Sequence, residues 1–241
     1  MDHVTIGLET DMINEITLEA QPDKISINPS ATAIIVVDMQ NAFARKGGYF
    51  DLIGFDISQT EKIIGSCKEI ITAGRERGIK VIFLQMEFDP DLSESGGPNS
   101  PRGRKSRAST LIREHPELKD RLHLHGVWGA DIIDELKPQP GDMTVRKQKH
   151  DGFIGTNLDA ILKTSGIKYL IFVGTATNIC VESTLRHAFP LGYFPILISD
   201  ATSPMGPPFT QEATIYNIQS TFGWVTTAGK FLSALREIQS T

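Results

Sequence analysis

The sequence predicts an α/β protein built on a three-layer, doubly wound sheet of the Rossmann-like type, mostly parallel, with about six strands and helices on both faces. Short apolar runs rich in β-branched residues recur along the chain, as expected of strands that are buried on both faces. Stretches with the spacing of amphipathic helices separate these runs. This alternation favours parallel strands joined by helices, and such sheets bind ligands beyond the carboxyl ends of their strands.

The elements can be placed along the chain in order. Residues 1–28 lack a strong period and predict an N-terminal extension, so that the main domain spans residues 29–241. Five strands are expected over residues 33–37, 80–84, 143–147, 169–173 and 195–199. Helices are expected over residues 59–76, 157–165, 178–191 and 209–221. Residues 87–110 interrupt the alternation with Gly, Pro, Ser and charges, and both a solvated insertion and a substrate-covering lid are open for them.

Composition excludes several classes of protein. The chain has 241 residues, of which 40% are hydrophobic, and this fits one large domain with a sizeable core. A net charge of −5 leaves no basic excess to bind a nucleic-acid backbone. No apolar run approaches the ~20 residues of a membrane span, and the first residues are acidic rather than a basic leader. With only two cysteines, we expect a cytoplasmic protein without nucleic-acid or membrane partners.

Charged residues follow two of the expected strands directly. Asp38 comes after strand 33–37, where it is either a helix cap or a buried functional acid that needs a partner. Lys147 ends strand 143–147, with Lys149 close behind it. Solvation explains most lysines. A lysine near Asp38 would nevertheless give the acid its partner, and a cation beside a cysteine stabilises the thiolate.

Cys180 follows a third strand. Gly174 and the small residues after it permit a tight strand-to-helix turn, with Thr177 or Asn178 as the N-cap and Cys180 in the first helical turn. The helix dipole there favours an anion and is expected to lower the thiol pKa, and the same amides could bind an oxyanion. These residues alone leave Cys180 equally open as a buried filler or a nucleophile. Cys67 lies mid-helix among isoleucines and is expected to fill the core.

Other site chemistries lack their motifs. There is no C-x-x-C pair, no H-E-x-x-H, and no G-x-G-x-x-G or Walker loop, which disfavours dithiol redox, zinc protease and dinucleotide-binding functions. A Cys-His dyad is possible but cannot be located. Five histidines are scattered without a carboxylate partner at helical spacing: His115, His123, His125, His150 and His187.

Three segments taken together resemble the isochorismatase-like cysteine hydrolases. They are "AIIVVDMQNAF", "TVRKQKHDGF" and "GTATNICVESTLRHAF", and the similarity covers roughly residues 28–238. Asp, Lys and Cys in this order at three successive strand ends are specific to that family. Within it the chain is most similar to the ureidoacrylate amidohydrolases of pyrimidine breakdown, with the biuret and triuret hydrolases as near relatives.

The resemblance implies a role for each of these residues. Asp38 would be the general base, Lys147 the cation that tunes acid and thiol, and Cys180 the nucleophile. The oxyanion hole would be built from Ala176, Thr177 and the amide of Cys180, with a cis peptide bond between Ala176 and Thr177. The thiolate would attack a carbonyl carbon, and water would hydrolyse the resulting thioester.

The substrate end differs from the ureidoacrylate pattern. That pattern has a tyrosine where this chain has Phe43, an asparagine in the segment of Met86, and a tyrosine at His150, so a changed substrate is plausible. The expected substrate-binding residues are Phe43, Gln85, Met86, His150, Asn178 and Gln219. The amide of Gln219 suits a ureide such as biuret. Three arginines could anchor a carboxylate or simply form a solvated face: Arg102, Arg104 and Arg107.

The sequence thus predicts a metal-free, cofactor-free cysteine amidohydrolase that cleaves a linear C–N bond of a ureide or small amide and releases carbamate or ammonia. Some family members bind zinc through Asp and His, but here Asp89 and Asp91 lack the histidines. The alternatives are a biuret or triuret hydrolase, and a non-catalytic small-molecule binding protein on the same fold. The family resemblance also implies a homo-oligomer, either a dimer or a tetramer.

Overall fold

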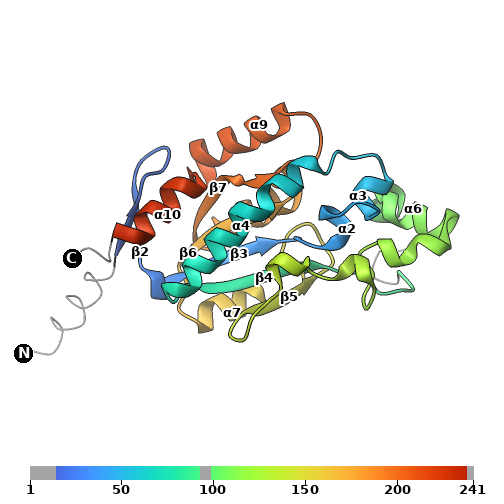
Figure 1. Ribbon diagram of the computed structural model, residues 1–241, viewed down its shortest axis with the longest axis horizontal. Coiled ribbons are helices and arrows are strands. Elements are labelled where there is room, and N and C mark those ends of the chain that lie inside the picture. Colours follow the sequence, from blue (N-terminus) through green and yellow to red (C-terminus); the bar gives the residue numbers. More distant parts are fainter. Residues whose placement is uncertain (1–14, 93–98, 238–241) are drawn as a thin grey trace, which may run out of the picture.

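The computed structural model describes residues 15–92 and 99–237. Within them the main sheet has six strands, all parallel, in the order β5-β4-β3-β6-β7-β8 (Figure 1). The strands are β3 (Thr32–Val37), β4 (Lys80–Met86), β5 (Met143–Lys147), β6 (Tyr169–Thr175), β7 (Phe194–Ser203) and β8 (Trp224–Thr226). The predicted α/β fold is therefore confirmed, with its five placed strands. The sixth, β8, has only three residues, too few for a pattern in the sequence.

Helices connect these strands. The α-helices are α2 (Asn41–Ala44), α3 (Tyr49–Leu52), α4 (Ser58–Glu76), α5 (Pro101–Lys105), α6 (Arg107–Glu114), α7 (Leu158–Thr164), α8 (Glu182–Ala188), α9 (Phe209–Asn217) and α10 (Ala228–Glu237). Short 3-10 turns are η1 (Pro29–Ala31), η3 (Pro116–Arg121), η4 (Trp128–Ala130) and η5 (Asp134–Leu136). Two single turns are π-helical, η6 (Thr177–Val181) and η7 (Ile218–Phe222). The predicted helix 178–191 is thus η6 followed by α8, and the predicted helix 209–221 is α9 followed by η7.

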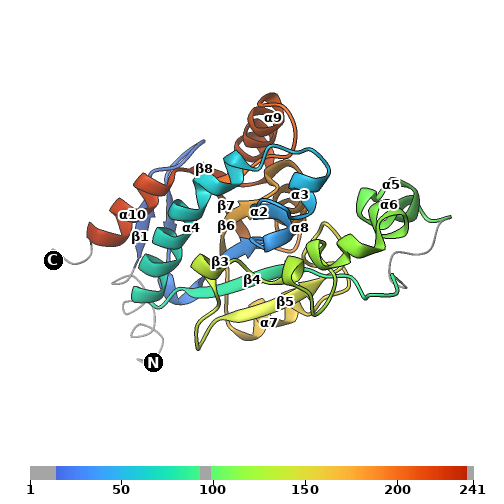
Figure 2. The ribbon, with the colours of Figure 1, turned by 45° about the vertical axis from the view of Figure 1, so that its right-hand side comes forward.

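The core has two layers, one on each face of the sheet. Along β3, Ile34 and Val36 pack with α4 and α10 on one face, whereas Ile35 and Val37 pack with α7 and α8 on the other. Figure 2 shows α4 and α10 on one side of the strands and α7 on the opposite side. All six residues of β3 are buried, which explains why this strand reads as a continuous apolar run.

The N-terminal segment packs on the face of the main sheet that α4 and α10 cover. Strands β1 (Ile16–Leu18) and β2 (Ile25–Ile27) form an antiparallel pair, which contributes buried isoleucines and leucine to the α4 and α10 side of the core. Gln21, between the two strands, exchanges backbone hydrogen bonds with Val225 of β8. Residues 1–14 of the predicted extension lie outside the described residues, and the boundary at residue 28 stays a prediction.

The segment 87–110 is partly helical. Residues 93–98 lie outside the described residues, but α5 and α6 form a projecting unit at the end of the molecule where the β3 strand ends (Figure 2). Ser100 caps α5 by accepting from the Gly103 amide, and Ser106 caps α6 by accepting from the Ser109 amide. None of the helices in the described parts of the chain has both the length and the apolar character needed to cross a membrane.

Candidate active site

A cavity of about 540 Å³ opens where the parallel strands end. Asp38 follows β3, Met86 ends β4 and Thr175 ends β6, and all three line the cavity. Helices α5 and α6 and the residue between them contribute part of the wall, through Pro101, Arg102, Lys105, Ser106, Arg107 and Ala108. The cavity therefore lies where ligands bind in doubly wound sheets.

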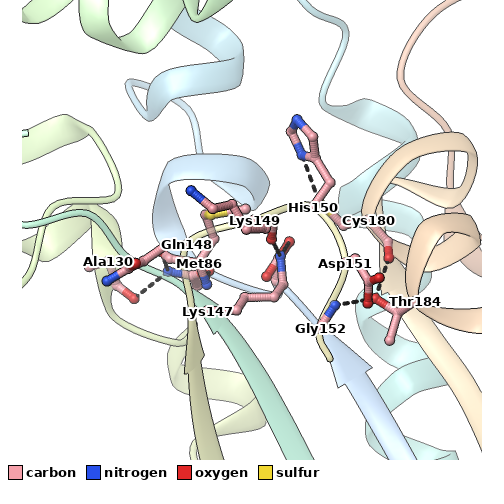
Figure 3. A network of polar contacts seen from close by, with 12 residues as sticks. Met86, Ala130, Lys147, Gln148, Lys149, His150, Asp151, Gly152, Cys180 and Thr184 are labelled. Atoms are coloured by element: carbon pink, nitrogen blue, oxygen red, sulfur yellow. Dashed lines mark hydrogen bonds and ion pairs between the residues drawn. The ribbon is translucent and has the colours of Figure 1, made fainter. Parts of the chain in front are cut away.

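Asp38 and Lys147 form a buried ion pair beneath this cavity. Lys147 Nζ lies 2.7 Å from Asp38 Oδ2, and the two side chains are 0% and 3% exposed. Lys147 Nζ also donates to the Lys149 carbonyl at 3.3 Å (Figure 3). Asp38 has a positive φ of 49°, an unusual conformation for a residue other than glycine. The sequence-based prediction that the two charges lie together agrees with this contact.

Burial acts on both charges of the pair. It raises the pKa of Asp38, against the opposing attraction of Lys147. Burial alone would lower the pKa of Lys147, but the combined attraction of Asp38 and Cys180 outweighs it, so that the pKa is raised. Lys147 therefore holds its proton more firmly than a free lysine does, and Asp38 is a stronger base than an exposed aspartate.

Cys180 lines the same cavity and is 7% exposed. Burial raises the pKa of its thiol to about 12, although Lys147 acts in the opposite direction. The expectation that the helix start lowers this pKa was wrong, because loss of solvation exceeds the effect of the nearby positive charges. The thiol interacts with both Asp38 and Lys147. It is thus protonated in the ligand-free site and needs a base to become a nucleophile.

The turn η6 carries Cys180 and is separated from β6 by one residue, Ala176. The Ile179 and Val181 amides both donate to the Ala176 carbonyl, at 3.0 and 3.2 Å. Ala176, Ile179 and Cys180 of this segment line the cavity, and the first amides of a helical turn have no acceptor within it. A non-proline cis peptide bond lies between Thr175 and Ala176. The predicted position, between Ala176 and Thr177, was wrong by one residue, since the bond lies where β6 itself ends.

His150 is the histidine that approaches the thiol. Its Nδ1 lies 3.5 Å from Cys180 Sγ (Figure 3). Partial burial, with the charges of Lys147 and Arg102, lowers the pKa of His150 to about 4, so that its ring is neutral near pH 7. Sequence spacing could not locate this contact, because His150 lies in the loop after β5 and Cys180 in the turn η6, 30 residues further along the chain.

Hydrogen bonds anchor the loop that carries His150. The Gly152 amide donates to Thr184 Oγ1 at 2.9 Å, and that hydroxyl donates to the Cys180 carbonyl at 2.7 Å (Figure 3). His187 Nδ1 lies 2.5 Å from Asp151 Oδ2. This histidine thus has a carboxylate partner 36 residues away in the chain, which a search at helical spacing could not find.

Aromatic rings line the half of the cavity away from the sheet. Phe43, Tyr49 and Phe88 surround the imidazole of His123, with ring centroids 5.1, 5.3 and 4.6 Å from it. Sequence reasoning missed Tyr49 and His123 as cavity residues. The aromatic pair at 49–50 was a usable signal, whereas nothing in the local sequence distinguishes His123 from the other histidines.

Cations from the projecting helices join this aromatic wall. The Arg102 guanidinium lies 4.2 Å from the centre of the Phe88 ring and donates to the Gln148 carbonyl. Arg107 donates to the Ile53 carbonyl at 2.9 Å. Arg102, Lys105 and Arg107 line the cavity, whereas Arg104 is exposed and does not.

Of the six expected substrate-binding residues, three line the cavity and three do not. Phe43, Met86 and His150 line the cavity. The other three lie outside its lining: Gln85, Asn178 and Gln219. The Gln85 amide donates to the Ala130 carbonyl at 2.8 Å, and the Asn178 side chain is bonded both ways to the backbone of Met205. Their amides serve to fix loops around the cavity.

The acidic segment after β4 forms ion pairs. Asp89 Oδ1 lies 2.6 Å from Arg146 Nη2, and Glu87 contacts His125 at 2.7 Å. Over the residues that the structure describes, no group of three His, Cys, Asp or Glu side chains could hold a metal ion.

Comparison with known proteins identifies the family. The model of the isochorismatase domain matches residues 32–230. The chain belongs to the isochorismatase family. Among its isochorismatase relatives, the ureidoacrylate amidohydrolase RutB of Agrobacterium fabrum is 48% identical, over 92% of this chain and 97% of that protein. The RutB protein of Serratia proteamaculans is 49% identical, over 91% and 89%.

Solved isochorismatase-like structures share the fold. A cysteine hydrolase from Pseudomonas syringae superposes with a TM-score of 0.71 at 27% identity, over 88% of this chain and 95% of the other. An N-carbamoylsarcosine amidase from Thermoplasma acidophilum gives a TM-score of 0.60 at 26% identity, over 82% and 96%. The family predicted from the three strand-end segments is thereby confirmed.

Proposed function

We propose that this chain is a cysteine-dependent amidohydrolase that cleaves the linear C–N bond of a carboxylate-bearing ureide, with ureidoacrylate as the first candidate. The observation that carries the proposal is the buried pair of Asp38 and Lys147 beside the Cys180 thiol in one cavity. Relatives named ureidoacrylate amidohydrolase, nearly half identical over most of the chain, support the same chemistry.

The geometry suggests a two-step reaction. Asp38 takes the thiol proton as Cys180 Sγ attacks the ureido carbonyl carbon, which forms a C–S bond and a tetrahedral oxyanion. The C–N bond then breaks, and the nitrogen leaves as an amine with the proton that Asp38 returns. Water hydrolyses the remaining S-carbamoyl thioester to carbamate and restores the thiol. Because burial raises the thiol pKa, Asp38 takes the proton as the sulfur attacks.

Lys147 and the η6 turn would support the charges of this reaction. Lys147 keeps Asp38 ionised despite its burial and stabilises the thiolate as it forms. In the proposal, the amides around Thr177 and Cys180 receive the oxyanion, since a helix start offers unpaired donors. Ala176 sets their direction by accepting from the Ile179 and Val181 amides.

Charge in the cavity favours a carboxylate-bearing substrate. Arg102, Lys105, Arg107 and Lys149 line the cavity, and Asp38 is the one carboxylate among the described lining residues. Because Lys147 already neutralises Asp38, the cavity presents a net positive lining to a ligand. Biuret and triuret are uncharged and would gain nothing from these cations, whereas a ureide with a carboxylate end would.

A substrate panel tests the proposal. Ammonia release is measured with ureidoacrylate, biuret, triuret and simple amides, using wild type, Cys180→Ala and the matched control Cys67→Ala. Cys67 is buried in α4 among core isoleucines and should be dispensable. We expect turnover of ureidoacrylate by wild type and by Cys67→Ala, and a loss on the order of 10⁴-fold or more in Cys180→Ala.

Each contrary result has its own meaning. Full activity of Cys180→Ala on every substrate would refute the nucleophile. Turnover of biuret or triuret but not ureidoacrylate would keep the chemistry and overturn the substrate. No turnover of any ureide, with ligand binding retained, would indicate a binding protein.

A homo-oligomer, dimer or tetramer, in the cytoplasm belongs to the same proposal. Support for assembly comes from large aromatic side chains at the surface of α9, where Phe209 and Tyr216 are 65% and 66% exposed. Light scattering of the purified chain tests it, and a monomer at all concentrations would contradict it.

A further inference from the structure

His123 is a buried polar residue in the cavity wall without a hydrogen bond to explain it. Its side chain is 5% exposed overall, and it lines the cavity. Nδ1 is buried with no partner among the residues that the structure describes. Buried polar side chains are nearly always hydrogen-bonded, so an imidazole in this position calls for a ligand or a function.

Packing holds the imidazole in one orientation. Phe43, Tyr49 and Phe88 surround the ring, and the His123 carbonyl accepts from the Phe88 amide at 3.0 Å. Because Nδ1 is enclosed, Nε2 is the nitrogen left to meet a molecule in the cavity. A ring held in this way loses little entropy when it binds, which is the condition for a selective hydrogen bond.

Arg102 shares the same corner of the cavity. Its guanidinium and the imidazole of His123 both pack on Phe88, with 4.2 and 4.6 Å to the ring centre. Burial and the Arg102 charge lower the pKa of His123 to about 3, so the imidazole is neutral when the enzyme is free. A neutral imidazole carries one N–H donor. It adds no further positive charge to a cavity wall that already holds cations.

We propose that His123 is a substrate-binding residue, which donates its Nε2 N–H to the carboxylate of the ureide while Arg102 supplies the charge. The inference rests on the proposed function and adds the group that recognises the end of the substrate away from the scissile bond. Nδ1 is then the bare nitrogen, enclosed by the rings. A site that pairs a substrate group with a buried donor rejects analogues that lack it.

Kinetics of two variants test the assignment. His123→Phe keeps a ring between Phe43, Tyr49 and Phe88 but removes the donor, and His123→Gln offers an amide N–H in its place. With ureidoacrylate we expect the KM of His123→Phe to rise on the order of 10- to 100-fold, with kcat changed by about threefold or less. His123→Gln should recover part of that loss. His125→Phe is the matched control, since His125 is exposed and outside the cavity lining.

The carboxamide of ureidoacrylate serves as a second substrate, which distinguishes a loss of carboxylate recognition from a folding defect. Wild type should prefer the acid, and His123→Phe should lose part of that preference while Arg102 keeps the rest, because a carboxylate accepts the N–H more strongly than an amide oxygen does and a merely structural fault would weaken both substrates equally. Nitrogen NMR of labelled histidine gives an independent readout in Cys180→Ala, which holds intact ureidoacrylate. We expect a neutral, Nε2-protonated His123 whose signal moves on binding.

The outcomes are distinct. An unchanged KM and acid preference in a folded His123→Phe, or an unmoved His123 signal in the complex, would overturn this inference while wild-type turnover upholds the proposed function. Absence of ureidoacrylate turnover and binding by wild type would overturn both.

Discussion

Asp38 and Cys180 show how burial affects the ionisation of the acid and of the thiol in the site. Burial disfavours the charged form of both groups and Lys147 opposes that penalty at both, but at the thiol the negative charge of Asp38 adds to the penalty. The thiol therefore keeps its proton until a substrate arrives. Strand-end positions singled out these three residues as candidates and the family resemblance gave them their roles, but the direction of the thiol pKa depends on burial, which only the packed structure determines.

The pH dependence of activity follows from Asp38. Its pKa is raised by burial, and the base is lost once it is protonated, so kcat/KM should fall with decreasing pH at a midpoint above the ordinary aspartate value of about 3.9. Asp38→Asn should lower kcat by on the order of 10²- to 10⁴-fold. A pH–rate profile measures both.

Asp134→Asn is the control for this profile, because Asp134 is exposed and pairs only with Lys137 among the ion pairs of the described chain. Its acid limb should coincide with that of wild type. A wild-type midpoint at or below the ordinary aspartate value would contradict the role of Asp38.

At the scale of elements, the contact between β3 and β6 depends on a glycine. Gly174 has a φ of 109°, and a Cβ added there would lie 2.2 Å from the Val37 carbonyl oxygen. This contact aligns the end of β3, with Asp38 next to it, against the start of the turn that carries Cys180. The glycine was visible in the sequence as a turn signal, but the close approach to β3 was not, because the two strands are far apart in the chain.

Two glycine-to-alanine substitutions with opposite effects test this contact. Gly174→Ala should lower the free energy of unfolding by about 3 kcal/mol, from backbone strain and the clash with β3. Gly65→Ala, on the exposed side of α4 with open space around it, should raise it by about 0.5 to 1 kcal/mol. Urea denaturation measures both, and equal effects of the two changes would contradict the steric account.

The remaining elements differ in how strongly the sequence marks them. β3, β4, β6 and β7 are long apolar runs, so their positions were predicted within a few residues. β8 has three residues, and η6 and η7 are single turns whose widened backbone has no sequence period to reveal it. These short elements acquire their form from contacts with the rest of the fold.

For the whole molecule, the charge around the cavity is opposite in sign to the net charge of the chain. The chain carries −5 overall, yet the cavity is lined by four cations. A carboxylate substrate is therefore repelled by the molecule as a whole and attracted at the cavity. Such local fields act over about a Debye length, which shortens from ~30 Å at 0.01 M salt to ~8 Å at 0.15 M.

Salt should therefore slow the reaction of the anion selectively. Raising ionic strength from about 0.01 to 0.15 M should lower kcat/KM for ureidoacrylate by about 3- to 10-fold and leave its carboxamide unchanged. Lys105→Gln should flatten this dependence, and Lys68→Gln, on the exposed side of α4, should not. Steady-state measurement of kcat/KM across a salt series tests this prediction. An equal dependence on ionic strength for the acid and the amide would argue against the cationic site.

The N-terminal hairpin contributes to stability from a distance. Leu18 is fully buried against the α10 side of the core. Leu18→Ala should lower the free energy of unfolding by about 3 kcal/mol without changing KM. Thr17→Ala, at the exposed neighbouring position of β1, is the control and should cost far less. An equally stable Leu18→Ala would show that residues 15–28 are an independent extension.

The class of fold, the family, and the order of Asp38, Lys147 and Cys180 at three strand ends could all be read from the amino-acid sequence, because apolar periodicity and short motifs are local properties. The tertiary structure alone decided what surrounds that site. It set the thiol pKa through burial, brought His150 to the sulfur, left Gln85 and Asn178 to hold loops, and enclosed His123 among aromatic rings. Each of these depends on residues that are distant in the chain and close only after folding.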